Sequence, residues 1–145
     1  GVCEAKPHAH KAGGEEWEAA RKHFSKAVDF LPWNANALFW SGMAELEFEN
    51  LQEAESLMNR SLLLDPDFKG PYVNLGVAYL RQGRHDKVRE ISEACLLRYP
   101  QSPQCHYHIG VAAYQKAARL CELEPDDPEV AAEGGLDCSQ LLEGA

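Results

Sequence analysis

The sequence lacks any long run of apolar residues. Its most apolar stretches are interrupted by charges, as in FWSGMAELEFE, and none approaches the roughly 18 residues that a membrane-spanning helix needs. We therefore expect no insertion into a membrane. Hydrophobic residues still make up 45% of the 145 residues, which is enough for a packed core in one ordinary domain.

Positive charge is also scarce. The chain has 14 Lys and Arg against 23 Asp and Glu, for a formal net charge of −9. A surface that binds nucleic acid must neutralise phosphates with Lys and Arg, and attraction to anionic lipids needs basic clusters. We expect no nucleic-acid partner. No signal peptide is visible, so we expect a cytoplasmic protein, or a periplasmic or other location if a signal was removed.

Cysteine motifs are missing as well. The five cysteines are odd in number and contain no CxxC pair, which argues against a zinc ribbon or a disulfide framework. We interpret them as reduced thiols in a cytosol-like compartment. Neither Cys3 with His8 and His10 nor Cys105 with His108 completes the four ligands of a tetrahedral zinc site, so we predict no metal and no other cofactor.

The sequence contains no GxSxG motif, no phosphate-binding loop and no pair of acids in a supporting context. We therefore predict that it is not an enzyme and has no catalytic residues. It also lacks convincing runs with the two-residue period of strands, and its β-branched content is low. The chain is predicted to be all α.

What the sequence does contain is a 34-residue repeat. Pro32, Pro66 and Pro100 are spaced by 34 residues, and the same spacing separates three glycines: Gly42, Gly76 and Gly110. Between these marks, helices are predicted over 35–48 and 52–64, and again over 69–82 and 85–98.

A glycine inside a helix costs about 1 kcal/mol relative to alanine. Gly76 therefore indicates that another backbone approaches closely. We expect this to be the return helix of the same pair, near Val88 and Cys95.

This arrangement resembles the tetratricopeptide repeat, in which a bulky residue, Leu-Gly, an aromatic residue, a small residue and a closing proline recur every 34 residues. Residues 69–102 carry the pattern most fully, as Tyr72, Leu75, Gly76, Tyr79, Gly83, Cys95 and Pro100. The resemblance implies an all-α fold, an α-solenoid of antiparallel helix-turn-helix repeats in a right-handed superhelical stack.

The resemblance also divides the chain. Residues 1–14 would be an irregular N-terminal segment or a degenerate first helix. Residues 15–127 would be the repeats, as a half repeat over 15–34, full repeats over 35–68 and 69–102, and a shortened one over 103–127. Residues 128–145 would be a C-terminal capping helix or the start of a further repeat.

The fourth unit is shorter than the others, because the next proline is Pro125 instead of a proline at position 134. Two interpretations are open. Nine residues are absent from this chain between Val111 and Glu124, or two half helices fuse into one long helix that ends the regular stack.

In this family the first helix of each pair lines a concave groove that binds extended peptides. The resemblance implies that ten residues, placed by their distance from each unit's glycine, form the peptide-binding surface: Phe39, Trp40, Met43, Val73, Asn74, Val77, Arg81, Tyr107, His108 and Val111. This surface is mainly apolar, so the expected ligand is an apolar or amphipathic segment of a protein or peptide partner.

The implied function is a protein-interaction module, an adaptor or scaffold. The sub-type that clamps acidic chaperone tails uses Lys, Arg and Asn. Only Asn74 fits it here, because the other matching positions carry Phe39, Met43, Gly70, Gln104 and His108. Two alternatives are a small acidic chaperone that shields a secreted or assembling client, and a non-catalytic fragment of a larger enzyme or complex. For such a fragment, self-association through exposed end helices is expected.

Overall fold

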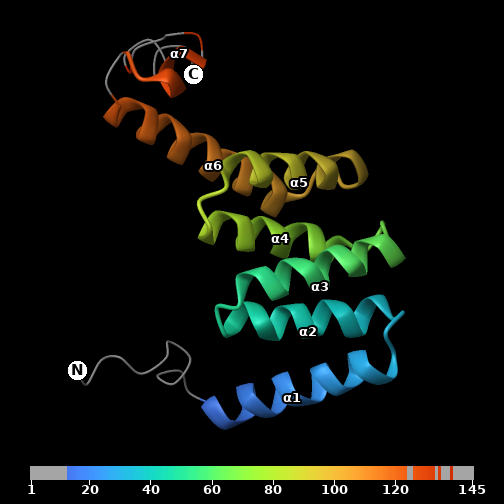
Figure 1. Cartoon of the computed structure of the whole chain (residues 1–145). Helices are drawn as coiled ribbons and strands as arrows, with labels where there is room; N and C mark the ends of the chain where they lie inside the picture. Colours follow the sequence, from blue (N-terminus) through green and yellow to red (C-terminus); the bar gives the residue numbers. More distant parts are fainter. Residues whose placement is uncertain (1–12, 124–125, 133, 135–137, 139–145) are drawn as a thin grey trace, which may run out of the picture.

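The computed structural model describes residues 13–123, 126–132, 134 and 138 (Figure 1). Within these residues all regular secondary structure is helical, and the all-α prediction is confirmed. The helices are α1 Gly14–Phe30, α2 Ala35–Glu47, α3 Leu51–Leu64, α4 Lys69–Arg81, α5 His85–Arg98, α6 Pro103–Glu122 and α7 Pro128–Ala132.

The helix ends follow from local sequence. Asn34 caps α2, because its side-chain oxygen accepts a hydrogen bond from the backbone N–H of Ala37 at 2.9 Å. Ser102 caps α6 through a bond from the N–H of Cys105 at 3.4 Å, and Pro103 occupies the first helical position. Gly83 has φ 69°, the left-handed conformation that reverses the chain between α4 and α5.

Successive helices pack against each other from α1 to α6, and α4 also contacts both α2 and α6. The connections α1–α2, α3–α4 and α5–α6 lie along one edge of the stack, and the turns α2–α3 and α4–α5 lie along the opposite edge (Figure 1). The chain is thus an α-solenoid, as predicted. In the part that the structure describes, no helix is long and apolar enough to cross a membrane.

The main apolar core runs through five of these helices. Its buried members come from α2 to α6 and share close packing across the helix pairs: Leu46, Ala54, Met58, Leu75, Ala78, Tyr79, Val88 and Ala112. A large apolar side chain buried in this way contributes about 1.5–3 kcal/mol of stability. Pro66 and Pro100 follow the ends of α3 and α5, and Gly42 and Gly76 lie at close contacts between helices.

Helix α6 differs from the other first helices. It is continuous over 20 residues, whereas α2 and α4 have 13 residues each. At 1.5 Å per residue it is about 30 Å long against about 20 Å, so it projects beyond the stack (Figure 1). In the structure the shortened unit is thus one continuous helix. The division of the chain into repeat units remains a prediction, and residues 1–12 and 139–145 lie outside the described residues.

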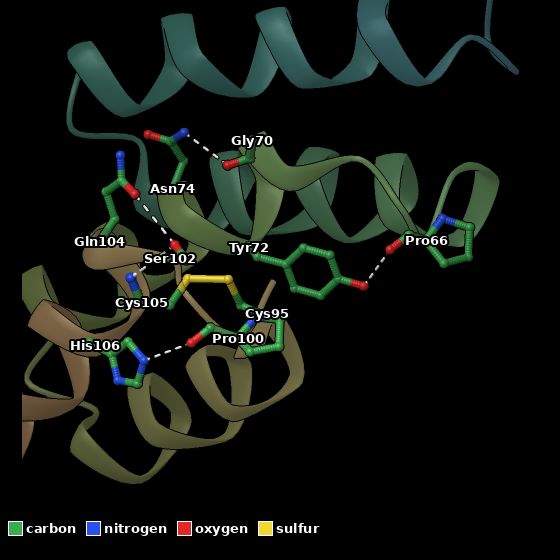
Figure 2. The surroundings of a disulfide bond; sticks show 10 residues. All are labelled: Pro66, Gly70, Tyr72, Asn74, Cys95, Pro100, Ser102, Gln104, Cys105 and His106. Carbon is green, nitrogen blue, oxygen red and sulfur yellow. Dashed lines mark hydrogen bonds between the residues drawn. A yellow bond between two sulfur atoms is a disulfide. The ribbon is translucent and has the colours of Figure 1, made fainter. Parts of the chain in front are cut away.

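The prediction of reduced thiols is wrong for four cysteines. Cys95 forms a disulfide with Cys105 (Figure 2). Cys121 forms a second disulfide with Cys138. The α5–α6 connection reverses the chain, so the end of α5 lies beside the start of α6 and the Cα atoms of Cys95 and Cys105 come within 6.5 Å. This distance is within the range of disulfides. An odd number of cysteines did not exclude two bridges.

Candidate functional site

The candidate site is the surface of α2, α4 and α6, which we call the inner face. All ten predicted binding residues lie on these three helices, and the helices are adjacent in space. The structure thus brings residues from sequence positions 39 to 111 onto neighbouring helices. Their side chains differ widely in exposure.

The most accessible part of the inner face is on α6. Tyr107 is 68% exposed and Tyr114 is 76% exposed, with the half-buried Val111 between them. Residues four and three apart lie on the same side of a helix, so these three form one stripe. Tyr114 lies seven residues after Tyr107 and extends the surface of the ten predicted residues along α6.

The stripe continues at lower exposure on the neighbouring helices. Val73 and Val77 on α4 and Met43 on α2 are half-buried. Val77 and Met43 pack against the main core, and Val73 packs against the cluster formed by Tyr72, Cys95 and Cys105. Part of each side chain therefore supports the fold and part remains available to a ligand.

Phe39 is not part of the exposed surface, contrary to the prediction. It is only 7% exposed, and its ring centroid lies 4.9 Å from that of Phe68 and 5.4 Å from that of Trp40. The reason is Gly70, where an added Cβ would lie 2.8 Å from two carbons of the Phe39 ring. The missing side chain at position 70 leaves the space that this ring fills.

His108 is also buried, at 5% exposure, so its side chain is not part of the accessible surface. Its ring packs over Gly76, where an added Cβ would clash with Nδ1. The close neighbour of Gly76 is therefore a side chain of α6, and not the return helix near Val88 and Cys95 that the sequence suggested. Burial lowers the pKa of His108, since desolvation disfavours the charged imidazolium.

Trp40, Asn74 and Arg81 already contact other residues of the chain. Trp40 is 48% exposed and stacks on Phe24 of α1 at 6.0 Å. Asn74 is half-buried and its Nδ2 donates to the carbonyl of Gly70 at 2.9 Å (Figure 2). An asparagine amide also has a second N–H and an acceptor oxygen for a ligand.

Arg81 is exposed, but its Nη1 donates to the carbonyl oxygen of Leu46 and to Glu49, both at 3.1 Å. This contact joins the end of α4 to the end of α2, so Arg81 has a structural role before any ligand binds. The accessible chemistry of the inner face is therefore aromatic and aliphatic, with one amide.

Several known proteins are similar to this chain in sequence or in fold. The family model for the tetratricopeptide repeat matches residues 45–107. This part of the chain is therefore similar to tetratricopeptide repeats. The matched region runs from the end of α2 to the start of α6, so it includes α3, α4 and α5 in full.

Relatives with these repeats are longer than this chain. It is 26% identical over 115 residues to the TPR repeat-containing protein YvcD of Bacillus subtilis, covering 72% of this chain and 24% of that protein. It is 31% identical over 81 residues to the human protein O-mannosyl-transferase TMTC3, covering 56% of this chain and 9% of that protein. The chain spans between 9% and 24% of the curated relatives it matches.

Among solved structures, the chain is similar to the second tetratricopeptide repeat domain of human RPAP3, in complex with an HSP70 peptide. The TM-score is 0.63 at 21% identity, covering 68% of this chain and 82% of that chain. This likeness shows the fold of the repeat stack.

Proposed function

We propose that this tetratricopeptide repeat chain binds an apolar or amphipathic segment of a partner protein on its inner face. A protein-interaction function is supported by the repeats and by the peptide complex of the RPAP3 domain. The observation that carries the finer proposal is the exposed stripe on α6, where two tyrosines are more than two-thirds exposed around Val111. Exposed apolar clusters on a folded surface usually mark interaction sites.

The chemistry of the surface defines the ligand. Val73, Val77 and Met43 offer apolar contact, and Asn74 offers hydrogen bonds to a ligand backbone. Arg81 already pairs with Glu49, and Gln104 and His108 occupy positions where a carboxylate clamp has other residues. The proposed ligand is therefore an apolar segment and not an acidic tail.

The test is binding of fluorescent amphipathic peptides to the wild type and to the double variant Asn74→Ala/Tyr107→Ala. Tyrosines at the centre of interfaces commonly contribute about 2 kcal/mol, so we expect at least a tenfold loss of affinity with unchanged helicity by circular dichroism. Leu97→Ser on α5 is the matched control, because it removes an 83% exposed side chain away from the inner face. Equal affinity in the double variant, or an equal loss in the control, would refute the assignment.

A second candidate function is a non-catalytic interaction segment of a larger protein. The favouring observation is that the chain spans a small share of its relatives, one of which is by name a transferase. Detecting the polypeptide in its source by antibody distinguishes the two, because a separate module runs near 16.1 kDa and a segment runs higher.

The two disulfides bear on location. Disulfides persist in oxidising compartments and are rare where glutathione keeps thiols reduced. We propose a non-reducing compartment in place of the cytoplasm expected from the sequence.

A further inference from the structure

The α1–α2 and α3–α4 connections lie along the same edge of the stack (Figure 1), and exposed large apolar side chains stand at or beside both. These side chains are between 40% and 83% exposed, and we call them the edge patch: Phe30, Leu31, Trp33, Leu63 and Leu64. None of these residues belongs to α2, α4 or α6, so the edge patch is separate from the inner face.

The segment that presents Trp33 is held by hydrogen bonds. The N–H of Leu31 donates to the carbonyl of Ala27 at 2.8 Å, and the N–H of Asn34 donates to the carbonyl of Leu31 at 3.1 Å. Asn34 also caps α2. Trp33 is therefore 82% exposed although its backbone is fixed. Because the backbone is already ordered, little backbone entropy is lost when Trp33 binds a partner.

A hollow of about 80 Å³ lies beside Trp33. It is lined by Pro32, Trp33, Leu38, Arg60, Leu63 and Leu64. Leu38 is fully buried and closes the hollow toward the core. The edge patch thus has both projecting side chains and a recess. In a two-fold dimer the same patch faces itself, so it must supply both shapes.

The apolar area fits such a dimer. Phe30 and Trp33 are each about four-fifths exposed, and an aromatic side chain buries about 200 Å², so the pair offers roughly 300 Å². The three leucines raise this to about 500 Å². A standard interface buries about 800 Å² on each partner, of which about 65% is apolar in homodimers. The edge patch supplies this apolar share.

Charge at the rim permits self-pairing. The exposed Asp29, Arg60 and Asp65 place charges of both signs beside the patch. The overall charge of −9 is screened beyond about 8 Å at physiological salt. We propose that the edge patch binds a second copy of this chain and forms a two-fold dimer. This surface differs from the end helices for which the sequence predicted self-association.

The test is sedimentation equilibrium over a wide range of protein concentration, in a Cys3→Ser background so that no intermolecular disulfide through that cysteine contributes. We expect a reversible monomer–dimer equilibrium for the parent. Leu63→Ser and Trp33→Ser each remove two anchors per dimer and should raise its dissociation constant at least about 100-fold. Both side chains are more than 80% exposed, so the fold should survive, which circular dichroism checks.

Leu97→Ser is the matched control. Leu97 is as exposed as Leu63, at 83%, and stands 34 residues later in the repeat, outside the patch. It should leave the dimer unchanged. A parent that is monomeric at every concentration would overturn the proposal. So would dimers that survive Leu63→Ser, or that dissociate equally with Leu97→Ser or with Asn74→Ala/Tyr107→Ala.

Discussion

At the residue scale, two glycines leave space for aromatic rings from neighbouring helices, and we call these positions sockets. Gly70 leaves space for Phe39, and Gly76 leaves space for His108. In both cases the ring comes from a helix of an adjacent hairpin, so these glycines position one hairpin on the next. Gly42 behaves differently, since an added Cβ there would meet Met58 of its own hairpin at 3.0 Å.

Alanine substitutions at Gly76 and Gly110 should therefore have opposite effects. Gly110 has no heavy atom within 4 Å of an added Cβ, so Gly110→Ala should stabilise the fold by up to about 1 kcal/mol through helix propensity. Gly76→Ala should destabilise it by about 1–3 kcal/mol, because the enclosed His108 ring must move. Urea unfolding of both variants measures this. Two changes of the same sign would contradict the socket interpretation.

The buried His108 predicts a pH dependence of stability. Its folded-state pKa is lowered by desolvation, so between the folded and unfolded pKa values the unfolded chain binds more protons. The stabilising contribution is complete above the unfolded pKa of about 6.5 and is lost as the pH falls through the lower folded pKa. The urea concentration at the unfolding midpoint should thus decrease as the pH is lowered from about 7.5 to about 5.5.

The control for this titration is His108→Met, which keeps a large side chain and removes the ionisable group. His108→Met should reduce the change in the urea midpoint over this pH range. Some change will remain, because the other histidines still titrate. An unchanged profile in His108→Met would show that His108 does not cause it.

At the element scale, the sequence predicted the helices well because two independent signals agree. Pro66 and Pro100 mark helix ends, and the apolar spacing defines the helices between them. The burial of Phe39 and His108 could not be predicted from helix ends and apolar spacing. It depends on which side chains are missing from the facing helix, and a periodic pattern read along one helix does not contain that information.

The disulfides were missed for a related reason. The pairing of Cys95 with Cys105 depends on how α5 and α6 pack, and cysteine count and motif spacing say nothing about it. A single continuous α6 likewise follows from the chain having no turn residues between Val111 and Glu122, a feature that the 34-residue period alone does not predict.

The bridge between α5 and α6 should stabilise the C-terminal hairpin. It closes a loop of sequence separation 10, for which the chain-entropy account gives about 2–3 kcal/mol. We expect Cys95→Ala/Cys105→Ala to lower the free energy of unfolding by this amount or somewhat more. Denaturant titration measures the change, and Cys95→Ala/Cys105→Ala should respond less to added reductant than the wild type. Equal responses would show that this bridge is absent in solution.

At the scale of the whole molecule, the inner face and the edge patch use different parts of each hairpin. The inner face lies on the first helices, and the edge patch lies where second helices end and first helices begin. Occupying one surface therefore leaves the other accessible. A two-fold dimer through the edge patch would carry two inner faces, and a partner with two apolar segments would bind it with avidity.

The described disulfides both lie in the second half of the chain, whereas α1 at the other end has no fully buried residue. The solenoid therefore has one cross-linked end, and the other end is held by half-buried side chains of α1 and by the ion pair between Arg21 and Glu45 of α2. Under mechanical tension, α1 would peel away first at low force, and the α5–α6 hairpin would yield last as a short, tethered unit.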